Sequence, residues 1–402
     1  MKNLMKFDSQ TLTKILKSPN FIRSKTTSAQ YVETRFKDPT FEKLMDNYKH
    51  LFKVISIQDL ILANTPPFIS IDLLSKVSQK FHLNRGALPF LRKFPRIFNV
   101  FYDSDKSQPC CKLTDLAVEI ARQESEATKT GIPIVVDRLV RLLSMSGSRS
   151  IPVRAVFKVW RELGLPDDFE DSVILQNPEL FTIRTNPNER NTHILELVDK
   201  DCKFRFLSEV ENWREKECQK WEGDCEFDRS KIRFAFKHGY PPGMRLSKGF
   251  RTKVKEWQSL PYLGPYEVIG KKRKSKEGIK KLEKRAVGIA HEFLSLTTEK
   301  MIEVEKISHF RKLFGIDLNI RDLFLDHPGI FYLSTKGYRH MVFLRESYER
   351  GCLINPNPVY DIRRKLLDLV LLGRKSLLLD DFDERNVRGS EEAGLRKDIG
   401  NW

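Results

Sequence analysis

The sequence predicts an α+β protein that is mostly helical and is built from repeated units, each with three helices followed by a β-hairpin, as in a winged-helix module. Three observations support this fold class. A Pro-x-aliphatic-Phe motif occurs three times, at residues 95–98, 178–181 and 328–331. Apolar residues at helical spacing precede the motif, and alternating apolar residues follow it. A basic, aromatic-rich insertion separates the last unit from the others.

The second and third units have the clearest patterns. Apolar residues recur at helical spacing in three segments before each motif, at 135–146, 151–164, 167–176, 286–296, 304–315 and 319–326. After the motif, two alternating runs flank a turn-rich tetrapeptide in the second unit and Gly337 in the third. The first copy has a longer loop, so we expect two regular units and one degenerate unit. Chance recurrence of a helix-ending proline before a buried phenylalanine is the alternative.

These patterns divide the chain into successive regions. We expect units at about 40–125, 130–202 and 286–350, a basic block at 229–285 between the second and third, and a further helix near 361–373. The tail at 374–402 is polar and mixed in charge, which is typical of disorder.

The first 35 residues are predicted to be an organelle-targeting presequence. The first 37 residues hold eight Lys/Arg against two acids, with many Ser and Thr and no secretory apolar core. The marked amphipathic start favours the mitochondrion over the chloroplast, and an ordinary basic N-terminal helix is the alternative. No apolar run is long enough for a membrane-spanning helix.

The basic block carries most of the positive charge of the protein. Between Arg229 and Arg285 there are 18 Lys/Arg and four Asp/Glu, against a net charge of +17 for all 402 residues. Seven aromatic residues lie among these cations. Cations neutralise phosphates, and aromatic rings stack on unpaired bases. The block therefore predicts nucleic-acid binding, with a solvated basic loop around a few core aromatics as the alternative.

Five cations after Pro241-Pro242-Gly243 are the first candidate contacts, namely Arg245, Lys248, Arg251, Lys253 and Lys255. A strand would project alternate cations to one side, whereas a helix would align Lys248, Arg251 and Lys255. Three aromatic residues that follow are candidates for base stacking: Trp257, Tyr262 and Tyr266. Packing of these rings onto the fold is the alternative, and we favour it for Trp257.

Three further groups complete the candidate contacts. The cluster Lys271, Lys272, Arg273 and Lys274 is expected to clamp phosphates, with a nuclear address as the alternative. The tip of the third hairpin offers Lys336, Tyr338 and Arg339, unless it is a generic polar turn. The last helix begins with Arg363 and Arg364, where exposed N–H groups also favour anions. Pairing of these two arginines with Asp361 and Asp368 is the alternative.

Catalytic motifs are missing from the sequence. His291-Glu292 lacks the second histidine of a metalloprotease helix, and there is no phosphate-binding glycine loop or nucleophile elbow. The six cysteines have no metal-ligand spacing. We therefore expect a protein that is not an enzyme, with no cofactor, no metal ligand and no small-molecule substrate.

Three segments resemble the plant organelle RNA recognition (PORR) family, at 91–103, 240–267 and 326–374, and the resemblance extends over about 36–373. It implies a non-catalytic plant protein imported into mitochondria or chloroplasts. Such a protein would bind organellar intron RNA and assist group II intron splicing, together with other splicing factors. The family offers no settled set of contact residues. The residues alone leave two alternatives: an organellar winged-helix protein that binds duplex DNA, and a structural protein of the organellar ribosome.

Overall fold

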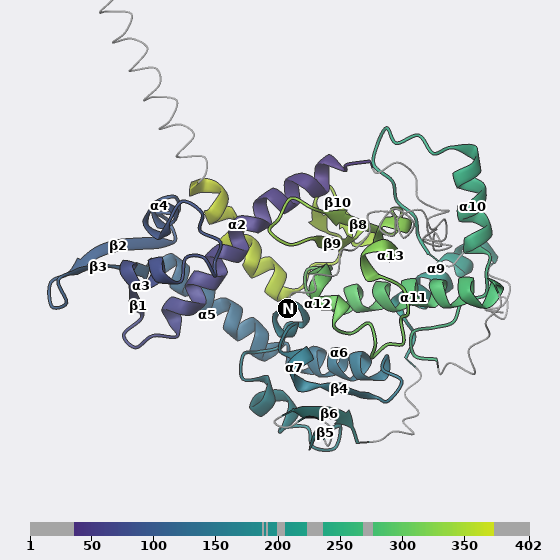
Figure 1. Cartoon of the computed structure of the whole chain (residues 1–402), viewed down its shortest axis with the longest axis horizontal. Coiled ribbons are helices and arrows are strands. Elements are labelled where there is room, and N and C mark those ends of the chain that lie inside the picture. The colour runs from purple at the N-terminus through teal and green to yellow at the C-terminus, as the bar shows by residue number, and fades with distance from the viewer. Residues whose placement is uncertain are drawn as a thin grey trace, which may run out of the picture.

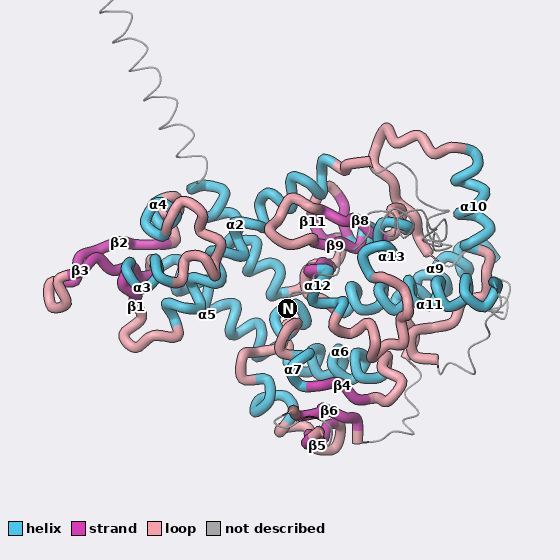
Figure 2. Tube along the Cα trace, in the orientation of Figure 1, coloured by secondary structure: helices cyan, strands magenta, loops and turns pink. Residues whose placement is uncertain are grey.

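The computed structural model describes residues 36–186, 189, 192–198, 206–222, 236–267 and 276–373. Helices and small antiparallel sheets make up these residues, so the predicted α+β class is confirmed (Figures 1 and 2). The predicted presequence, the polar tail and the Lys271–Lys274 cluster lie outside the described residues.

Three sheets share one topology. Each has a short first strand and a hairpin, and the last strand of the hairpin lies in the middle of the sheet. The strands are β1 (Phe68–Ser70), β2 (Phe98–Asp103) and β3 (Gln108–Leu113) in unit one, β4 (Ser150–Pro152), β5 (Phe181–Thr185) and β6 (His193–Leu197) in unit two, and β7 (Met301–Glu303), β8 (Phe331–Ser334) and β9 (Met341–Leu344) in unit three. The sequence analysis missed the first strand of each unit, because three residues are too few to show alternation.

Helices precede the hairpin in every unit. They are α2 (Pro39–Leu62), α3 (Ile71–Lys76) and α4 (Ala87–Arg92) in unit one, α6 (Ile132–Ser144), α7 (Val153–Val156), α8 (Trp160–Leu163) and a π-helical turn (Glu170–Ile174) in unit two, and α11 (Lys276–Leu296), α12 (Val304–Ser308) and α13 (Ile320–Asp326) in unit three. The connecting elements are α5 (Asp115–Thr130), α9 (Glu209–Glu222) and α10 (Lys248–Gln258). A short 3₁₀ turn (Arg345–Ser347), strands β10 (Tyr348–Glu349) and β11 (Cys352–Leu353), and a helix over 358–373 follow unit three.

The Pro-x-aliphatic-Phe motif marks the first strand of each hairpin. Its phenylalanines, Phe98, Phe181 and Phe331, begin β2, β5 and β8 and are all buried. Each is paired with a leucine at the end of the last strand, which aligns the hairpin on its core. Chance recurrence does not explain a motif that occupies the same place in three sheets of identical order.

The expectation that unit one is degenerate was wrong. Its hairpin pairs six residues of β2 with six of β3, from Phe98 opposite Leu113 to Asp103 opposite Gln108. The other two hairpins pair five and four. Gln108 and Pro109 belong to β3, whereas the pattern of apolar residues predicts that they lie in the loop.

Two hydrophobic cores hold the described residues together. One joins units two and three with the basic block, and the other joins unit one with the helix over 358–373. The sheet of unit three contributes to both, because Leu333 and Val342 face the first core and Tyr332 and Phe343 face the second. Helix α2 therefore packs on unit three, although the two are separated by 290 positions in the sequence, as between Glu42 and Tyr332.

Candidate nucleic-acid interface

Helix α10 presents a row of cations to solvent. The Ser247 hydroxyl caps its first turn by accepting a hydrogen bond from the Phe250 N–H at 3.2 Å. Phe250 and Trp257 lie seven residues apart and bury the opposite side of the helix. The helical alternative from the sequence is therefore correct, and Lys248, Arg251 and Lys255 form an exposed row that we call the basic face of α10.

The cations of the basic face have no acidic partner among the described residues. Arg245, Lys248, Arg251 and Lys255 are exposed, and none of them forms an ion pair with an acidic residue in the part of the chain that the structure describes. Exposed cations without carboxylate partners are available to phosphates.

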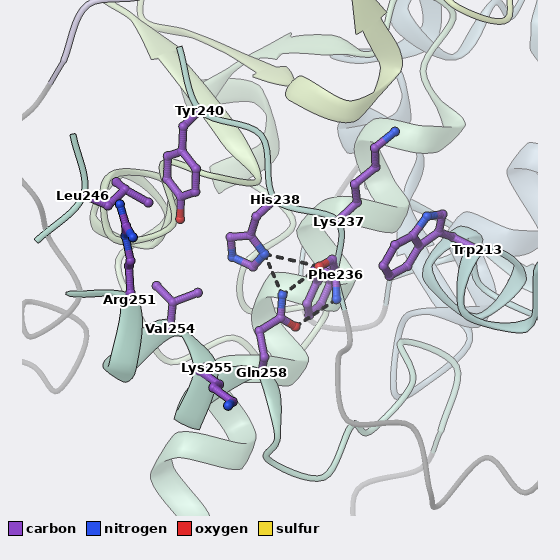
Figure 3. Close-up of a pocket in the computed structure, with 10 residues that line it drawn as sticks. All are labelled: Trp213, Phe236, Lys237, His238, Tyr240, Leu246, Arg251, Val254, Lys255 and Gln258. Atoms are coloured by element: carbon purple, nitrogen blue, oxygen red, sulfur yellow. Dashed lines mark hydrogen bonds between the residues drawn. The ribbon is translucent and has the colours of Figure 1, made fainter. Parts of the chain in front are cut away.

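A groove of about 360 Å³ lies beside the basic face (Figure 3). Its lining combines aromatic rings, an amide and cations, from α9, from the segment before α10 and from α10 itself: Trp213, Phe236, Lys237, His238, Tyr240, Leu246, Arg251, Val254, Lys255 and Gln258. Trp213 lies at one end of the groove, and Arg251 with Leu246 lies at the other (Figure 3). The size falls within the roughly 300–1,000 Å³ of small-ligand sites.

Gln258 holds the wall of the groove in place. Its amide nitrogen donates to the Phe236 carbonyl at 2.7 Å, and its amide oxygen accepts from the Phe236 N–H at 3.0 Å. The same nitrogen lies 2.6 Å from Nδ1 of His238. Burial lowers the pKa of His238 to about 4, so the ring is neutral near pH 7. Because the Gln258 amide nitrogen can only donate, Nδ1 accepts this hydrogen bond in the tautomer that carries its proton on Nε2.

The segment that carries His238 also packs closely on unit three. The Gly239 N–H donates to the Gly329 carbonyl at 2.8 Å. A Cβ at Gly329 would lie 2.5 Å from Cδ2 of His238 and 2.7 Å from the Tyr240 hydroxyl. The third motif therefore needs glycine where the first two have Arg96 and Glu179, because only there does another segment lie against it.

Two cations of the basic block are structural. The buried ammonium of Lys284 donates to the carbonyls of Gln258, at 2.6 Å, and Leu260, which lie at the C-terminal end of α10. Burial lowers the pKa of Lys284 to about 7. The guanidinium of Arg285 donates to the carbonyl oxygens of Pro265 and Glu267 at 3.2 and 3.1 Å. The end of the block therefore anchors α10 and the loop that follows it.

Comparison with known proteins supports the family resemblance. The model of the plant organelle RNA recognition domain matches residues 36–375. The chain belongs to the PORR family. It is 38% identical to Protein ROOT PRIMORDIUM DEFECTIVE 1 of Arabidopsis thaliana over 381 residues, covering 92% of this chain and 91% of that protein.

Other PORR relatives carry organelle names. The chain is 31% identical to Protein WHAT'S THIS FACTOR 9, mitochondrial, of Arabidopsis thaliana, with 92% of both chains covered. It is 28% identical to Protein WHAT'S THIS FACTOR 1 homolog, chloroplastic, of Oryza sativa subsp. japonica, covering 92% of this chain and 70% of that protein. No solved structure matches the chain.

The three aromatic candidates of this PORR chain all pack against its core. Trp257 is 1% exposed and packs between Phe236 and His327, so the core alternative is correct and base stacking on Trp257 is wrong. Tyr266 donates its hydroxyl to the buried Glu292 carboxylate at 2.6 Å. Tyr262 lies against α11, where a Cβ on Gly288 would lie 2.8 Å from its hydroxyl. Both tyrosines are partly buried against the core, and base stacking on either of them stays a prediction.

The tip of the third hairpin docks on unit one. Lys336 forms an ion pair with Asp46 of α2 at 2.5 Å, and the ring of Tyr338 stacks on His82 with centroids 3.5 Å apart. Arg339 pairs with Glu303 and Glu305 at 2.7 and 3.3 Å. Lys336 and Arg339 already have acidic partners in the folded chain, and their contact with RNA stays a prediction. Tyr338 remains 74% exposed, so its contact stays a prediction.

Arg363 is a buried structural residue. It is 6% exposed and pairs with Glu124 at 2.8 Å and with Glu299 at 3.7 Å. Arg364 is half-buried and donates to Sγ of Cys352 at 2.9 Å. The prediction of an RNA contact at Arg363 is therefore wrong, and so is the alternative pairing with Asp361 or Asp368. The actual partners of Arg363 come from α5 and from the turn after α11.

Two residues considered for catalysis have structural roles instead. His291 Nε2 lies 2.6 Å from Glu346, and Glu292 accepts the Glu209 N–H at 2.8 Å. The described ranges hold no group of three or more His, Cys, Asp or Glu placed to bind a metal ion. No described helix combines the length and apolar character needed to cross a bilayer.

Several groove residues were not singled out as candidates from the sequence. Tyr240 is one of the seven aromatic residues of the basic block, but Lys237, His238 and Gln258 carry no separate signal in the sequence. Trp213 comes from α9, outside the basic block. Only the folded chain brings it to the groove.

Proposed function

We propose that this PORR chain binds RNA in a plant organelle through the basic face of α10 and the adjoining groove, and promotes group II intron splicing without catalysing it. The observation that carries the proposal is a row of exposed cations, without an acidic partner in the described ranges, beside a groove with aromatic walls. Family membership supports RNA as the polyanion. Other splicing factors are expected as partners, and residues 36–373 are proposed to act as one RNA-binding domain.

The geometry of the basic face suits a flexible single strand of RNA. With a helical rise of about 1.5 Å per residue, Lys248 and Lys255 lie roughly 10 Å apart along α10, so the row follows an extended backbone. Each cation neutralises a phosphate, and Trp213 and Tyr240 border a groove where an unpaired base can stack. Splicing would be favoured if the spliceable RNA fold binds this surface better than competing folds, because binding shifts populations only by differential affinity.

The mitochondrion is the proposed organelle. The relatives named for organelles include both chloroplastic and mitochondrial proteins. The alignment with this chain covers 92% of the length of the mitochondrial relative, against 70% of the length of the chloroplastic relative from rice. Import of a tagged chain into isolated mitochondria and chloroplasts would decide between them.

Duplex DNA binding is less well supported. A winged-helix protein places its third helix in the major groove and its wing on the backbone. In unit two, the helical turn in that position carries Glu170 and Asp171, which repel phosphates. In unit three, the wing tip is occupied by unit one. A role in the organellar ribosome would predict co-sedimentation with ribosomal subunits.

The test at the interface is the triple variant K248Q/R251Q/K255Q, which removes the charges of the basic face. For a single strand, each lost phosphate contact lowers the salt slope by about 0.7, so the slope of log K against log salt should become shallower by about 2. Binding to an intron RNA should weaken accordingly. The control K43Q/K129Q/K312Q removes three exposed charges elsewhere and should retain most of the slope. Equal losses in both variants would mean that the face is not a specific contact.

The test in the organelle is to crosslink the tagged chain and sequence the bound RNA. Enrichment of one or a few introns supports the splicing proposal. Ribosomal RNA, DNA or background alone would contradict it. Splicing of the enriched introns should then fail in plants that express only the triple variant.

A further inference from the structure

The three sheets have equivalent outer faces with different chemistry. The shared topology aligns Phe68 and Phe101 of unit one with Ser150 and Arg184 of unit two, and with Met301 and Ser334 of unit three. In each unit these positions lie on the side of the sheet away from the helices of its own unit. They can therefore be compared directly.

The outer face of unit three is a covered apolar surface. Met301, Tyr332 and Phe343 belong to the core that includes α2. The ring of Phe41 from α2 stacks on Tyr332 with centroids 5.0 Å apart. This face is therefore covered by α2 within the molecule.

The outer face of unit two is small and largely polar. Thr182 and Ser150 lie opposite Glu196 on β6, and Arg184 lies one position further along the same face. Arg184 pairs with Glu196 at 3.5 Å. There is no aromatic ring on this face and its cation is neutralised.

The outer face of unit one combines aromatic rings with cations. Phe68 and Phe101 pack edge to face with centroids 5.7 Å apart. Lys106 lies 5.4 Å from the centre of the Phe68 ring, and Lys112 lies 5.7 Å from that of Phe101. Asn99 is exposed beside them. We call this set the aromatic face of unit one.

Neither phenylalanine contributes to a core of the described chain. Ile69, Phe98 and Cys111 on the inner side of the same sheet belong to the core of unit one, but Phe68 and Phe101 are neither in a core nor among the residues packed against one. The hairpin that carries Phe101 projects away from the body of the molecule (Figure 1). Both rings are partly exposed on the outer face of the sheet, and their packing on each other does not join either of them to a core.

We propose that the aromatic face of unit one is a second RNA site, which stacks unpaired bases on Phe68 and Phe101 while Lys106 and Lys112 contact the neighbouring phosphates. Aromatic rings on an open sheet are a known platform for single-stranded bases. The surrounding segment is basic, with eight Lys/Arg and two Asp between Lys76 and Lys112. Of the two acids, Asp103 is engaged in the hairpin turn, where its carboxylate accepts the Asp105 N–H at 3.1 Å. This charge favours a polyanion over an apolar protein partner.

The proposal rests on RNA binding by the chain and adds a preference for unpaired bases. The variant F68L/F101L keeps apolar side chains but removes both ring faces. It should bind an unstructured oligouridylate at least about thirtyfold more weakly than wild type, since two stacking platforms are lost. Binding to an RNA duplex of the same length, which exposes no base faces, should be unchanged. The control S150A/R184Q changes the corresponding positions of unit two and should bind both probes nearly as wild type does.

The outcomes separate this proposal from the one on α10. Wild-type affinity for oligouridylate in F68L/F101L, with no crosslinked peptide from residues 68–112, would overturn the second site and leave the first intact. Equal losses for oligouridylate and duplex would also overturn it, because stacking on bases cannot weaken duplex binding. If wild type binds neither probe, RNA binding itself fails. A selective loss for oligouridylate, with crosslinks at the aromatic face, would support the proposal.

Discussion

The basic face of α10 and the tip of the third hairpin contain the same kinds of residue, yet the fold uses them differently. Lys248, Arg251 and Lys255 point to solvent with no acidic partner among the described residues. Lys336 and Arg339 are each paired with carboxylates, and the partner of Lys336 lies 290 positions away in the sequence. We therefore expect a cation to contact RNA most readily where no acidic residue from a distant segment pairs with it.

Arg363 is the extreme case of a neutralised cation, and its removal should have the largest effect on stability. Arg363→Met leaves Glu124 and the buried Glu299 without their partner. Breaking a buried ion pair from one side costs about 3–5 kcal/mol, and urea unfolding would measure the loss. RNA affinity of the folded fraction should not change.

The neighbouring position provides the control for that variant. Arg364→Met removes a half-buried guanidinium that donates to Cys352, so a loss of about 1 kcal/mol is expected. If Arg363→Met remains as stable as Arg364→Met while RNA binding falls, Arg363 is a contact after all and the assignment as a structural residue is wrong.

Structural elements that depend on residues close together in the sequence could be predicted from local patterns. The Pro-x-aliphatic-Phe motif located three hairpins, because the motif and the strand that it begins are adjacent in sequence. The spacing of Phe250 and Trp257 is enough to orient α10 once it is known to be a helix. The three-residue strands β1, β4 and β7 were missed because their pairing partners are remote and their length shows no period.

Contacts between remote segments account for the errors in the site. Nothing near Arg363 in the sequence indicates Glu124, and nothing near Gly337 indicates that the hairpin tip meets α2, where a Cβ on Gly337 would lie 3.0 Å from Met45. The same applies to Trp213 in the groove. Composition identifies cations and rings, but only the fold decides which of them remain exposed.

The stability of the groove beside the basic face should depend on pH. The pKa of His238 is lowered from 6.5 to about 4 in the folded chain, so the unfolded state binds more protons between these values. The contribution of His238 to the free energy of unfolding is complete above pH 6.5. It is lost as the pH falls toward 4, by at most about 3 kcal/mol. Hydrogen-exchange protection of the Phe236 and Gly239 amides should fall over this range, because protonated Nδ1 cannot accept from Gln258.

The variant His238→Asn tests whether His238 causes this pH dependence. Asparagine can accept a hydrogen bond near the position of Nδ1 but does not titrate between pH 4 and pH 6.5. Protection of the two amides in the variant should be nearly independent of pH over this range. An identical decline in wild type and variant would assign the pH dependence to another group, such as one of the carboxylates around Glu346.

The smallest effect is expected at the hairpin tip, and it tests the comparison most directly. Lys336→Gln removes a charge that Asp46 already neutralises, so the salt slope of RNA binding should not change. Lys255→Gln removes one charge of the same type from the basic face and should make the slope shallower by about 0.7. Filter binding across a salt series measures both. If the two variants lose the same slope, RNA displaces Asp46 from Lys336, and the tip acts as an RNA contact despite its acidic partner. If only Lys255→Gln loses slope, the ion pair between units one and three persists in the complex, and exposure without a partner is what distinguishes the contact surface.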